Sequence, residues 1–224
     1  MKTTELIERV MQITLSPDHD EDDILDILNA GLLDIAGGGD RQHGNALIAP
    51  LPDLFTKDTV TVTAGSETTA MPATFHRGLA RLSFNRAGLK RYDSAMALLL
   101  RYEDAAAGEP EAYALLGNTL WVRPIPTVKT TLTAYFTRRP EALTRLDTSV
   151  PEGLPEHLQK RLLVHYACRE IWSDIEQGLD GNTPETLKHD ALFMRALTDL
   201  ERFIGPADGE AQNVADESFS EDNI

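Results

Sequence analysis

Three strand candidates, two of them joined by a short turn, constrain this chain more than any other feature of its 224 residues. Residues 119–123 and 129–137 alternate apolar and polar side chains, which is the pattern of half-buried strands. Gly117-Asn118 links the first run to residues 111–116, and a short turn containing glycine between two such runs predicts a β-hairpin. The stretch therefore predicts an antiparallel meander of three strands.

Prolines and further β-branched runs extend this β region. Pro124 and Pro126 cannot donate ladder hydrogen bonds, so they predict a corner or an exposed edge. Residues 59–64 alternate and are rich in threonine and valine, which favours a strand. In the strand at 129–137, Leu132, Ala134 and Phe136 are expected to face one side and Thr131, Thr133 and Tyr135 the other. Further short strand candidates lie around Phe75, at 79–84 and at 95–102.

Helical periodicity marks the beginning of the chain. Apolar residues repeat at helical spacing from Thr3 or Thr4 onward, and again from Asp20 to Ala36. The second helix carries acids in its first turn, where the positive end of the helix dipole stabilises them. The glycine triplet at 37–39 predicts its end, because it lacks the lysine and the preceding strand of a phosphate-binding Walker motif.

The C-terminal part is also expected to be helical. Pro155 suits the first turn of a helix, which the glycines within 178–181 end. Thr183 then caps a second helix, which Pro184 enters and which ends before Gly205. A short loop joins the two helices, so they are expected to form an antiparallel hairpin. The apolar stripes consist of Leu163, Val164, Ala167, Cys168, Ile171, Trp172 and Ile175 in the first helix and Phe193, Leu197, Leu200, Phe203 and Ile204 in the second.

These patterns predict an α+β fold, in which helices from both ends of the chain form one helical bundle with an inserted antiparallel β subdomain. The N-terminal and C-terminal helices both carry apolar faces that need cover, and packing them together supplies it. The expected parts are the N-terminal helices at 1–40, the β-rich subdomain at 41–154, the C-terminal helical hairpin at 155–205 and an acidic tail or arm at 206–224.

A net charge of −15 argues against non-specific phosphate binding by the whole surface. The charge is uneven. Residues 18–26 and the tail are acidic, whereas residues 72–102 carry six Lys and Arg side chains and a single acid, Asp93. Each of these runs fits a solvated face, and together they also fit a chain that docks against copies of itself.

The single cysteine, Cys168, excludes an intrachain disulfide and fits a reducing compartment. It stands on an apolar helix, where a small buried thiol is expected rather than a nucleophile. No basic stretch followed by an apolar run opens the sequence, and no window approaches the roughly 18 apolar residues of a membrane span. We therefore expect neither a secretion signal nor a membrane segment.

Residues 108–172 carry most of a resemblance to a known family. The shared positions are Gly108-Glu109-Pro110 with Tyr113, Gly117-Asn118-Thr119-Leu120-Trp121, Pro124-Ile125-Pro126, Leu132-Thr133-Ala134-Tyr135-Phe136, Arg139-Pro140, Leu143-Thr144 and Gly153-Leu154-Pro155-Glu156-His157. The Asp-rich start of the helix that contains Leu28-Asn29 is similar as well. In these turns, prolines and core residues, the chain resembles the head-to-tail adaptor proteins of tailed bacteriophages over most of residues 3–177.

The resemblance implies a structural virion protein without catalysis, metal or cofactor. Members of that family form a ring, typically of twelve copies, below the portal. The ring extends the DNA channel and provides the platform for the tail, and DNA passes through without sequence-specific binding. The implied partners are the portal protein, further copies of this chain, and tail, nozzle or stopper proteins. The implied location is the neck of the virion, after synthesis in the host cytoplasm.

Three groups of residues are candidates for contacts in such a ring. At the corner of the β element, Trp121 is either an interface residue or ordinary core. The acids near residue 20 either line the channel and repel DNA phosphate or form a solvated helix start. The tail's composition predicts disorder in isolation and folding onto a basic portal or a neighbouring subunit. The candidates are Trp121, Pro124, Pro126, Tyr135, Arg138 and Arg139 for the interface; Asp18, Asp20, Glu21, Asp22 and Asp23 for the channel lining; and Asp208, Glu210, Asp216, Glu217, Phe219 and Ile224 for the portal-docking arm.

A metal-dependent hydrolase of the histidine-aspartate type is the competing enzyme hypothesis. His165 and the pair His189-Asp190 resemble its metal ligands, but too little chain follows Asp190 for that fold. We therefore expect His165 in or beside a helix interface and His189 on a solvated turn. The acids from Asp18 onward resemble the start of a calcium loop, but they lack its glycine at the sixth position and its glutamate at the twelfth.

A stopper, tail terminator or other minor tail ring protein is a second alternative. Such a protein also assembles as a ring without catalytic residues. The helical ends of this chain favour an adaptor, because stoppers and terminators rely more heavily on β structure.

Overall fold

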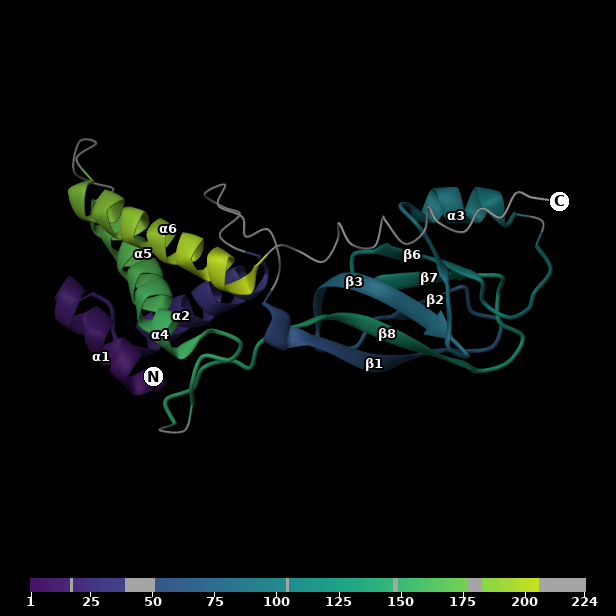
Figure 1. Cartoon of the computed structure of the whole chain (residues 1–224), viewed down its shortest axis with the longest axis horizontal. Helices are drawn as coiled ribbons and strands as arrows, with labels where there is room; N and C mark the ends of the chain where they lie inside the picture. The colour runs from purple at the N-terminus through teal and green to yellow at the C-terminus, as the bar shows by residue number, and fades with distance from the viewer. Residues whose placement is uncertain (17, 39–50, 104, 147–148, 177–182, 206–224) are drawn as a thin grey trace. The chain divides into compact units, whose positions relative to one another are not determined.

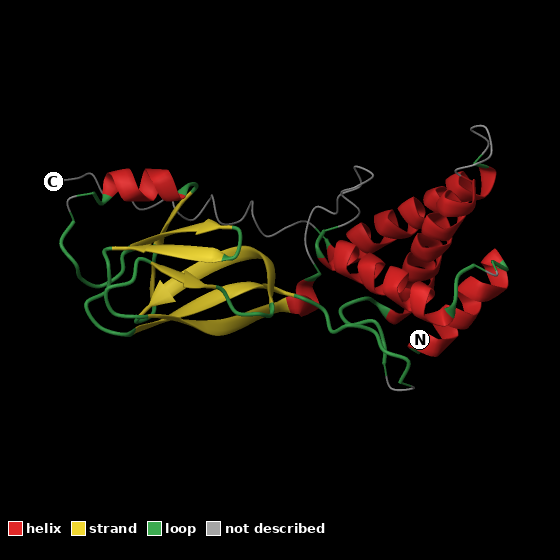
Figure 2. Ribbon diagram, turned by 180° about the vertical axis from the view of Figure 1, so that it is seen from behind, coloured by secondary structure: helices red, strands yellow, loops and turns green. Residues whose placement is uncertain are grey.

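The computed structural model describes residues 1–16, 18–38, 51–103, 105–146, 149–176 and 183–205 (Figure 1). Contacts between Cα atoms divide the chain into two compact units. One consists of Met1–Asp53 with Pro140–Ile224, and the other of Leu54–Arg139. The first unit is helical, and the second contains two β-sheets and a short helix (Figure 2). The α+β class predicted from the sequence is confirmed.

Helices from both ends of the chain make up the helical unit. Helix α5 contacts α6, α1 and α2. A π-helical turn, η2, joins α4 to α5 without a break. The predicted helices are therefore present. The elements are α1 (Thr3–Thr14), α2 (Glu21–Ala36), α4 (Glu156–Gln159), η2 (Lys160–Val164), α5 (His165–Glu176) and α6 (Pro184–Ile204).

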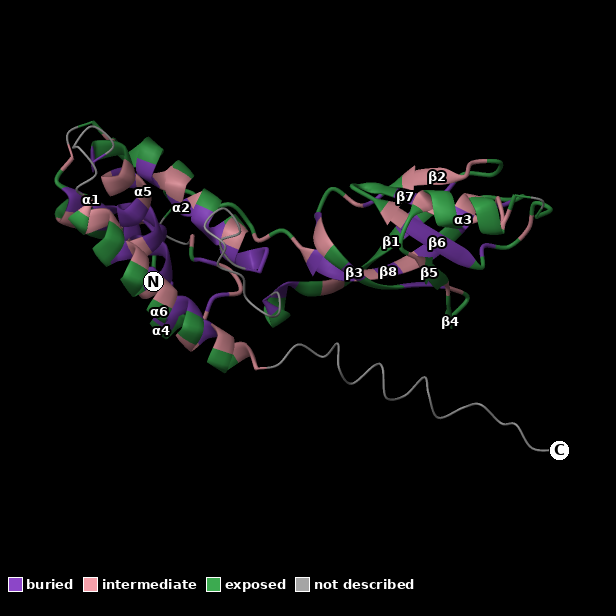
Figure 3. Ribbon diagram, turned by 90° about the horizontal axis from the view of Figure 1, so that it is seen from above, coloured by how far each residue is buried: buried purple, intermediate pink, exposed green. Residues whose placement is uncertain are grey.

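The core of the helical unit follows the predicted apolar stripes (Figure 3). Leu28 of α2, Ile171 of α5 and Phe193 of α6 are fully buried. The stripes do not reach the ends of their helices, because Ile175 is 37% exposed and Phe203 is 63% exposed. Further buried residues are Leu6, Val10, Ile24, Leu32, Leu163, Val164, Ala167, Cys168, Leu197 and Leu200.

Two four-stranded sheets form the β unit. Their strand orders are β1-β8-β3-β4 and β2-β7-β6-β5. All pairs are antiparallel except β5 with β6. The elements are η1 (Pro52–Leu54), β1 (Phe55–Val62), β2 (Thr68–Ala70), β3 (Phe75–Phe84), β4 (Ala87–Gly88), β5 (Lys90–Tyr92), α3 (Ala95–Arg101), β6 (Ala112–Leu116), β7 (Thr119–Arg123) and β8 (Thr130–Arg138).

One apolar cluster joins the two sheets. Val60 of β1 and Leu82 of β3 pack in the same cluster as Leu120 of β7. The alternation predicted for β8 is confirmed: Leu132, Ala134 and Phe136 are fully buried, while Thr131 is exposed and Thr133 and Tyr135 are half-buried. The two sheets therefore bury their apolar faces against each other. The remaining members are Val62, Met71, Phe75, Leu79, Tyr113 and Val122.

The predicted meander is wrong in its last strand. Strands β6 and β7 form the expected hairpin, but β8 pairs with β1 and β3 in the other sheet. Between β7 and β8 the chain accepts backbone hydrogen bonds from two other loops. The carbonyl of Ile125 accepts from the Gly108 amide at 2.9 Å, and that of Pro126 accepts from the Gly65 amide at 2.8 Å. The prolines thus mark the crossing from one sheet to the other.

The strand predicted at 95–102 is also wrong, because this segment forms helix α3. The Ser94 Oγ accepts from the Ala97 amide at 3.1 Å and so caps the helix. Unbranched leucine, methionine and alanine side chains fill the segment, and these residues favour helices. Only Leu98 of α3 is fully buried. The helix therefore packs on β6 through a narrow contact centred on this residue.

Candidate interaction surfaces

Polar side chains hold the segment before α4 against the helical unit. The Asn29 carboxamide donates to the Leu143 carbonyl at 3.2 Å and accepts from the Leu143 amide at 2.6 Å. The Thr3 hydroxyl and amide both donate to the Ser149 carbonyl at 3.0 Å. The carboxamide of the buried Gln159 accepts from the Met1 ammonium at 2.8 Å and donates to the carbonyls at 151 and 154. These contacts fix the N-terminus, Leu143 and residues 149–154 to one body.

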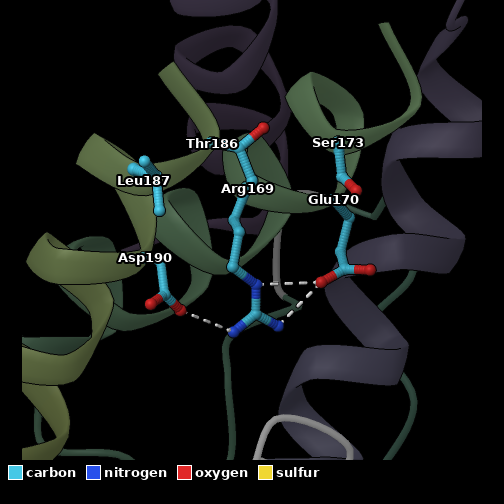
Figure 4. A pocket seen from close by; sticks show the side chains of 6 residues that line it. All are labelled: Arg169, Glu170, Ser173, Thr186, Leu187 and Asp190. Atoms are coloured by element: carbon cyan, nitrogen blue, oxygen red, sulfur yellow. Dashed lines mark hydrogen bonds and ion pairs between the residues drawn. The ribbon is translucent and has the colours of Figure 1, made fainter. Parts of the chain in front are cut away.

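Arg169 is the buried charge of the helical unit, at 2% exposure. Its guanidinium donates to Glu170 at 2.7 and 2.9 Å and to Asp190 at 3.3 Å (Figure 4). It also lies 4.8 Å from the Tyr166 ring centroid and 5.1 Å from that of Phe193. Both carboxylates are partly exposed and compensate the buried charge. A small pocket here is lined by Arg169, Glu170, Ser173, Thr186, Leu187 and Asp190.

Helix α6 is capped by the end of α5. The Glu176 carboxylate, 4% exposed, accepts from the amides of Glu185 and Thr186 at 3.1 Å and from the Thr186 hydroxyl at 2.6 Å. Burial disfavours the ionised carboxylate, but these bonds outweigh it and lower the Glu176 pKa below its ordinary value. The predicted Thr183 side-chain cap is wrong, because Thr183 makes no side-chain cap bond. The glycines at 178 and 181 lie outside the described residues.

The two histidines of the enzyme hypothesis contact each other between α5 and α6. The Nδ1 atoms of His165 and His189 lie 3.1 Å apart. The expected interface position of His165 is confirmed. His189 is not on a solvated turn but in the second turn of α6, at 2% exposure, on the same face as Phe193. Burial first, and the neighbouring His189 second, lower the pKa of His165 to about 4, so the ring is neutral near pH 7.

The metal ligands of the hydrolase hypothesis are not all brought together among the described residues. No group of three or more His, Cys, Asp or Glu side chains in the described ranges is close enough to hold a metal ion. Burial raises the pKa of the Cys168 thiol to about 12, which keeps it protonated and unreactive. The two histidines contact each other between α5 and α6, and the Cys168 thiol is buried in the helical unit.

The acids at the start of α2 have local structural roles. The Asp20 carboxylate accepts from the amides of Asp22 and Asp23 at 2.8 and 3.0 Å, and Asp23 accepts from the Asp20 amide at 3.1 Å. These hydrogen bonds from Asp23 and Asp22 lower the pKa of Asp20. Glu21 and Asp22 form ion pairs with Arg145. All five acids from Asp18 to Asp23 are nevertheless exposed.

The interface candidates of the β unit lie in two different sheets. Trp121 of β7 is half-buried and packs with Leu98 beneath α3. Pro124 is half-buried and Pro126 is buried, so the corner is less exposed than expected. Tyr135 of β8 stacks on Phe55 with ring centroids 6.5 Å apart, and Phe55 itself is 54% exposed.

The remaining candidates follow β8 or lie outside the described residues. Arg138 is half-buried and donates to the carbonyl of Arg139, which is exposed. The arm candidates Asp208, Glu210, Asp216, Glu217, Phe219 and Ile224 lie outside the described residues. Sequence patterns gave no signal for Phe55 or Gln159, because each contacts a partner far along the chain, Tyr135 and Met1 respectively.

Comparison with known proteins assigns the chain to a family. The family model described as SU10 adaptor protein matches residues 1–215. No curated protein matches the chain. Among the described helices, none has both the length and the apolar character to cross a membrane. The family match spans both units, so it agrees with the adaptor resemblance of the sequence. The chain therefore belongs to the SU10 adaptor protein family and is a structural adaptor protein of a bacteriophage virion.

Proposed function

We propose that this adaptor forms a ring under the portal, which extends the DNA channel and offers the attachment platform for the tail. The observation that carries the proposal is the family match over residues 1–215. A ring subunit needs a body that keeps its shape when neighbours press against it. Asn29, Gln159 and Glu176 supply bonds of this kind between segments of the helical unit.

In this proposal the helices form one bundle and the β unit is an insertion into it. The chain enters the β unit at Phe55 and leaves it after Thr137. These two residues are cross-strand partners in β1 and β8. Adjacent ends are what an inserted domain needs, because they add no strain to the domain that receives it. The exposed Phe55 and the half-buried Tyr135 beside it offer an aromatic contact for a neighbour or for a tail protein.

The exposed acids around the start of α2 face the channel in this proposal. Asp18 and Asp23 make no ion pair within the described part of the chain, whereas Glu21 and Asp22 are paired with Arg145. Unpaired carboxylates repel phosphate, so DNA passes the ring without binding it. No catalytic step is part of the function proposed.

Sedimentation velocity of the full chain, with and without the portal protein of the same genome, tests the ring. The expected result is one large species that contains the chain and the portal protein in equal copies. A chain that sediments unchanged beside the portal contradicts the proposal. Binding to a purified tail protein but not to the portal would instead identify a stopper or a tail ring protein.

A further inference from the structure

A cationic strip lies where the edges of both sheets meet. Strand β4 ends one sheet and β5 ends the other, and they follow each other directly in the chain. Four exposed cations stand on or beside them, and no acid occurs between residues 72 and 92. We call this strip, formed by Arg81, Arg86, Lys90 and Arg91, the basic edge.

The charges of the basic edge are not compensated within the described residues. Arg81 donates to the Arg86 carbonyl at 3.5 Å, and Arg91 donates to the Leu79 carbonyl at 3.4 Å. The Lys90 ammonium lies 5.3 Å from the Tyr92 ring centroid. Across the described ranges, none of the four cations forms an ion pair with a carboxylate. Exposed cations without acidic partners attract an anionic ligand.

The turn that presents Arg86 is conformationally costly. Asn85 and Arg86 have φ angles of 49° and 71°, and they connect the paired residues Phe84 and Ala87. Two-residue hairpins of this kind favour glycine at the second position, because its missing Cβ permits positive φ. An arginine there places a charge at the hairpin tip, although its Cβ makes the positive φ angle energetically unfavourable. Strain retained at an exposed position is a sign of a binding role.

We propose that the basic edge binds the acidic segment 206–224 of a second copy of this chain. The segment contains Asp208, Glu210, Asp216, Glu217, Glu221 and Asp222 and no Lys or Arg. Its 19 residues span at most about 60 Å when extended. The ring of the proposed function supplies the second copy, so the inference rests on that function.

Apolar groups beside the basic edge favour a protein segment over DNA as the occupant. Helix α3 contacts β5 and carries Met96 and Leu100, which are 64% and 66% exposed. These two side chains lie one helical turn apart on the same face. The acidic segment carries Phe219 and Ile224, which can cover them, whereas a phosphate backbone offers no apolar surface. The net charge of −15 also disfavours DNA.

Disulfide trapping between two full-length variants tests the contact. One chain carries Ala87→Cys beside Arg86, and the other carries Ser218→Cys beside Phe219. Cys168 does not interfere, because it is buried. A disulfide between positions 87 and 218 in this mixture joins two copies by necessity. We expect it to form well above the yield of a control mixture, in which Ala191→Cys on the exposed face of α6 replaces Ala87→Cys.

Charge reversal tests whether the cations are responsible. Arg86→Glu with Lys90→Glu, added to the Ala87→Cys chain, should lower the yield of the disulfide about tenfold, because like charges then meet. Arg195→Glu with Lys160→Glu makes the same change of net charge on exposed positions of the helical unit and should leave the yield unchanged. An ionic strength of about 1 M should also lower the yield, since the screening length falls to about 3 Å.

Three results would overturn the inference. They are a yield equal to that of the control mixture, an intrachain disulfide that forms only in a chain carrying both cysteines, and duplex DNA that displaces the acidic segment at stoichiometric amounts. The portal experiment remains separate. Portal binding without the disulfide contradicts this inference alone, and the disulfide without portal binding contradicts the proposed function alone.

Discussion

Close contacts at single residues determine which substitutions the helical unit tolerates. Gly31 of α2 faces the ring of Tyr166, whose hydroxyl donates to Asp34 at 2.8 Å. The Tyr166 ring also meets Phe193 edge-on, with centroids 5.5 Å apart. The ring is thus held on two sides and cannot give way to a larger residue at position 31.

Gly31→Ala is predicted to destabilise the helical unit by about 1–3 kcal/mol. Its Cβ would lie 2.6 Å from a ring carbon of Tyr166, closer than van der Waals contact allows. The usual effect in a helix interior has the opposite sign, a gain of about 1 kcal/mol. Urea unfolding measures the change. Gly108→Ala, where nothing lies within 4 Å of the new atom, is the control and should stay within about 0.5 kcal/mol of the wild type.

The histidine pair predicts a loss of stability in mild acid. The pKa of His165 is about 4 in the folded chain against 6.5 as the ordinary value, and burial lowers that of His189 as well. The unfolded chain therefore binds these protons first, so stability is complete above pH 6.5 and falls as the pH drops toward 4. His165 contributes up to about 3 kcal/mol to this loss. The charged groups around the pair are Arg9, Arg161, Glu185 and Lys188.

Thermal unfolding at a series of pH values between 7.5 and roughly 4 measures this effect. His165→Gln should flatten the profile in that window, because it removes the group that titrates. His157→Gln changes an exposed histidine and should leave the profile of the wild type intact. Equal slopes in all three proteins would show that the buried pair does not govern acid stability.

At the scale of elements, periodicity predicts what an element is, and distant partners decide where it goes. The spacing of Leu6 and Val10 was sufficient to predict α1, because a helix at the surface of a protein buries one apolar face. The same reasoning could not assign β8 to its sheet, since the pairing of Val60 with Leu132 joins residues far apart in sequence. It also missed the burial of His189, because that residue lies inside α6 only if the helix begins at Pro184.

Short apolar runs and the starts of helices account for the other differences between the predicted and the observed elements. The run around Leu98 fits a strand or a buried helix equally well, and the cap at Ser94 decided in favour of α3. Thr183 fits the pattern of an N-cap, but Glu176 occupies the donors that such a cap would use. The interface candidates share a stretch of sequence and yet lie in two sheets, because the chain crosses at Pro124 and Pro126.

The cap that joins α5 to α6 predicts a variant with an acid-dependent defect. Glu176→Gln should lower the unfolding temperature at pH 7, because an amide offers one acceptor oxygen where the carboxylate uses two. The pKa of Glu176 is lowered in the folded chain, so its contribution is present above its ordinary value of 4.5 and is lost as the pH falls through the folded value. The difference between variant and wild type should therefore shrink on acidification.

Hydrogen exchange locates this defect. Protection should fall in the first turn of α6, around Glu185 and Thr186, whose amides lose their acceptor. Glu8→Gln alters an exposed acid of α1 and serves as the matched control. Unchanged protection in Glu176→Gln would mean that the carboxylate does not hold this turn.

At the scale of the whole molecule, two units with separate cores share one chain. The helical core contains Leu28 and Ile171, and the core between the sheets contains Val60 and Phe136. The chain passes from one unit to the other near Leu54 and returns near Arg139. Each unit can therefore present its own surface, which suits an adaptor that meets several partners.

Replacing residues 54–139 by a short Gly-Ser linker is predicted to leave the helical unit folded. Phe55 and Thr137 are cross-strand partners, so a short linker spans the gap without strain. Circular dichroism should show a helical spectrum and a single cooperative unfolding transition. A non-cooperative transition would show that the β unit is required for the helical core. The full chain measured in parallel is the reference.

Electron cryomicroscopy of the chain mixed with its portal protein tests whether this adaptor is a ring subunit bound to the portal, as proposed. We expect a closed ring on one end of the portal, coaxial with its channel and equal to it in copy number. Each subunit should contain both the helical unit and the β unit. Portal particles without added density, or with the chain bound off the axis, would contradict the proposed function.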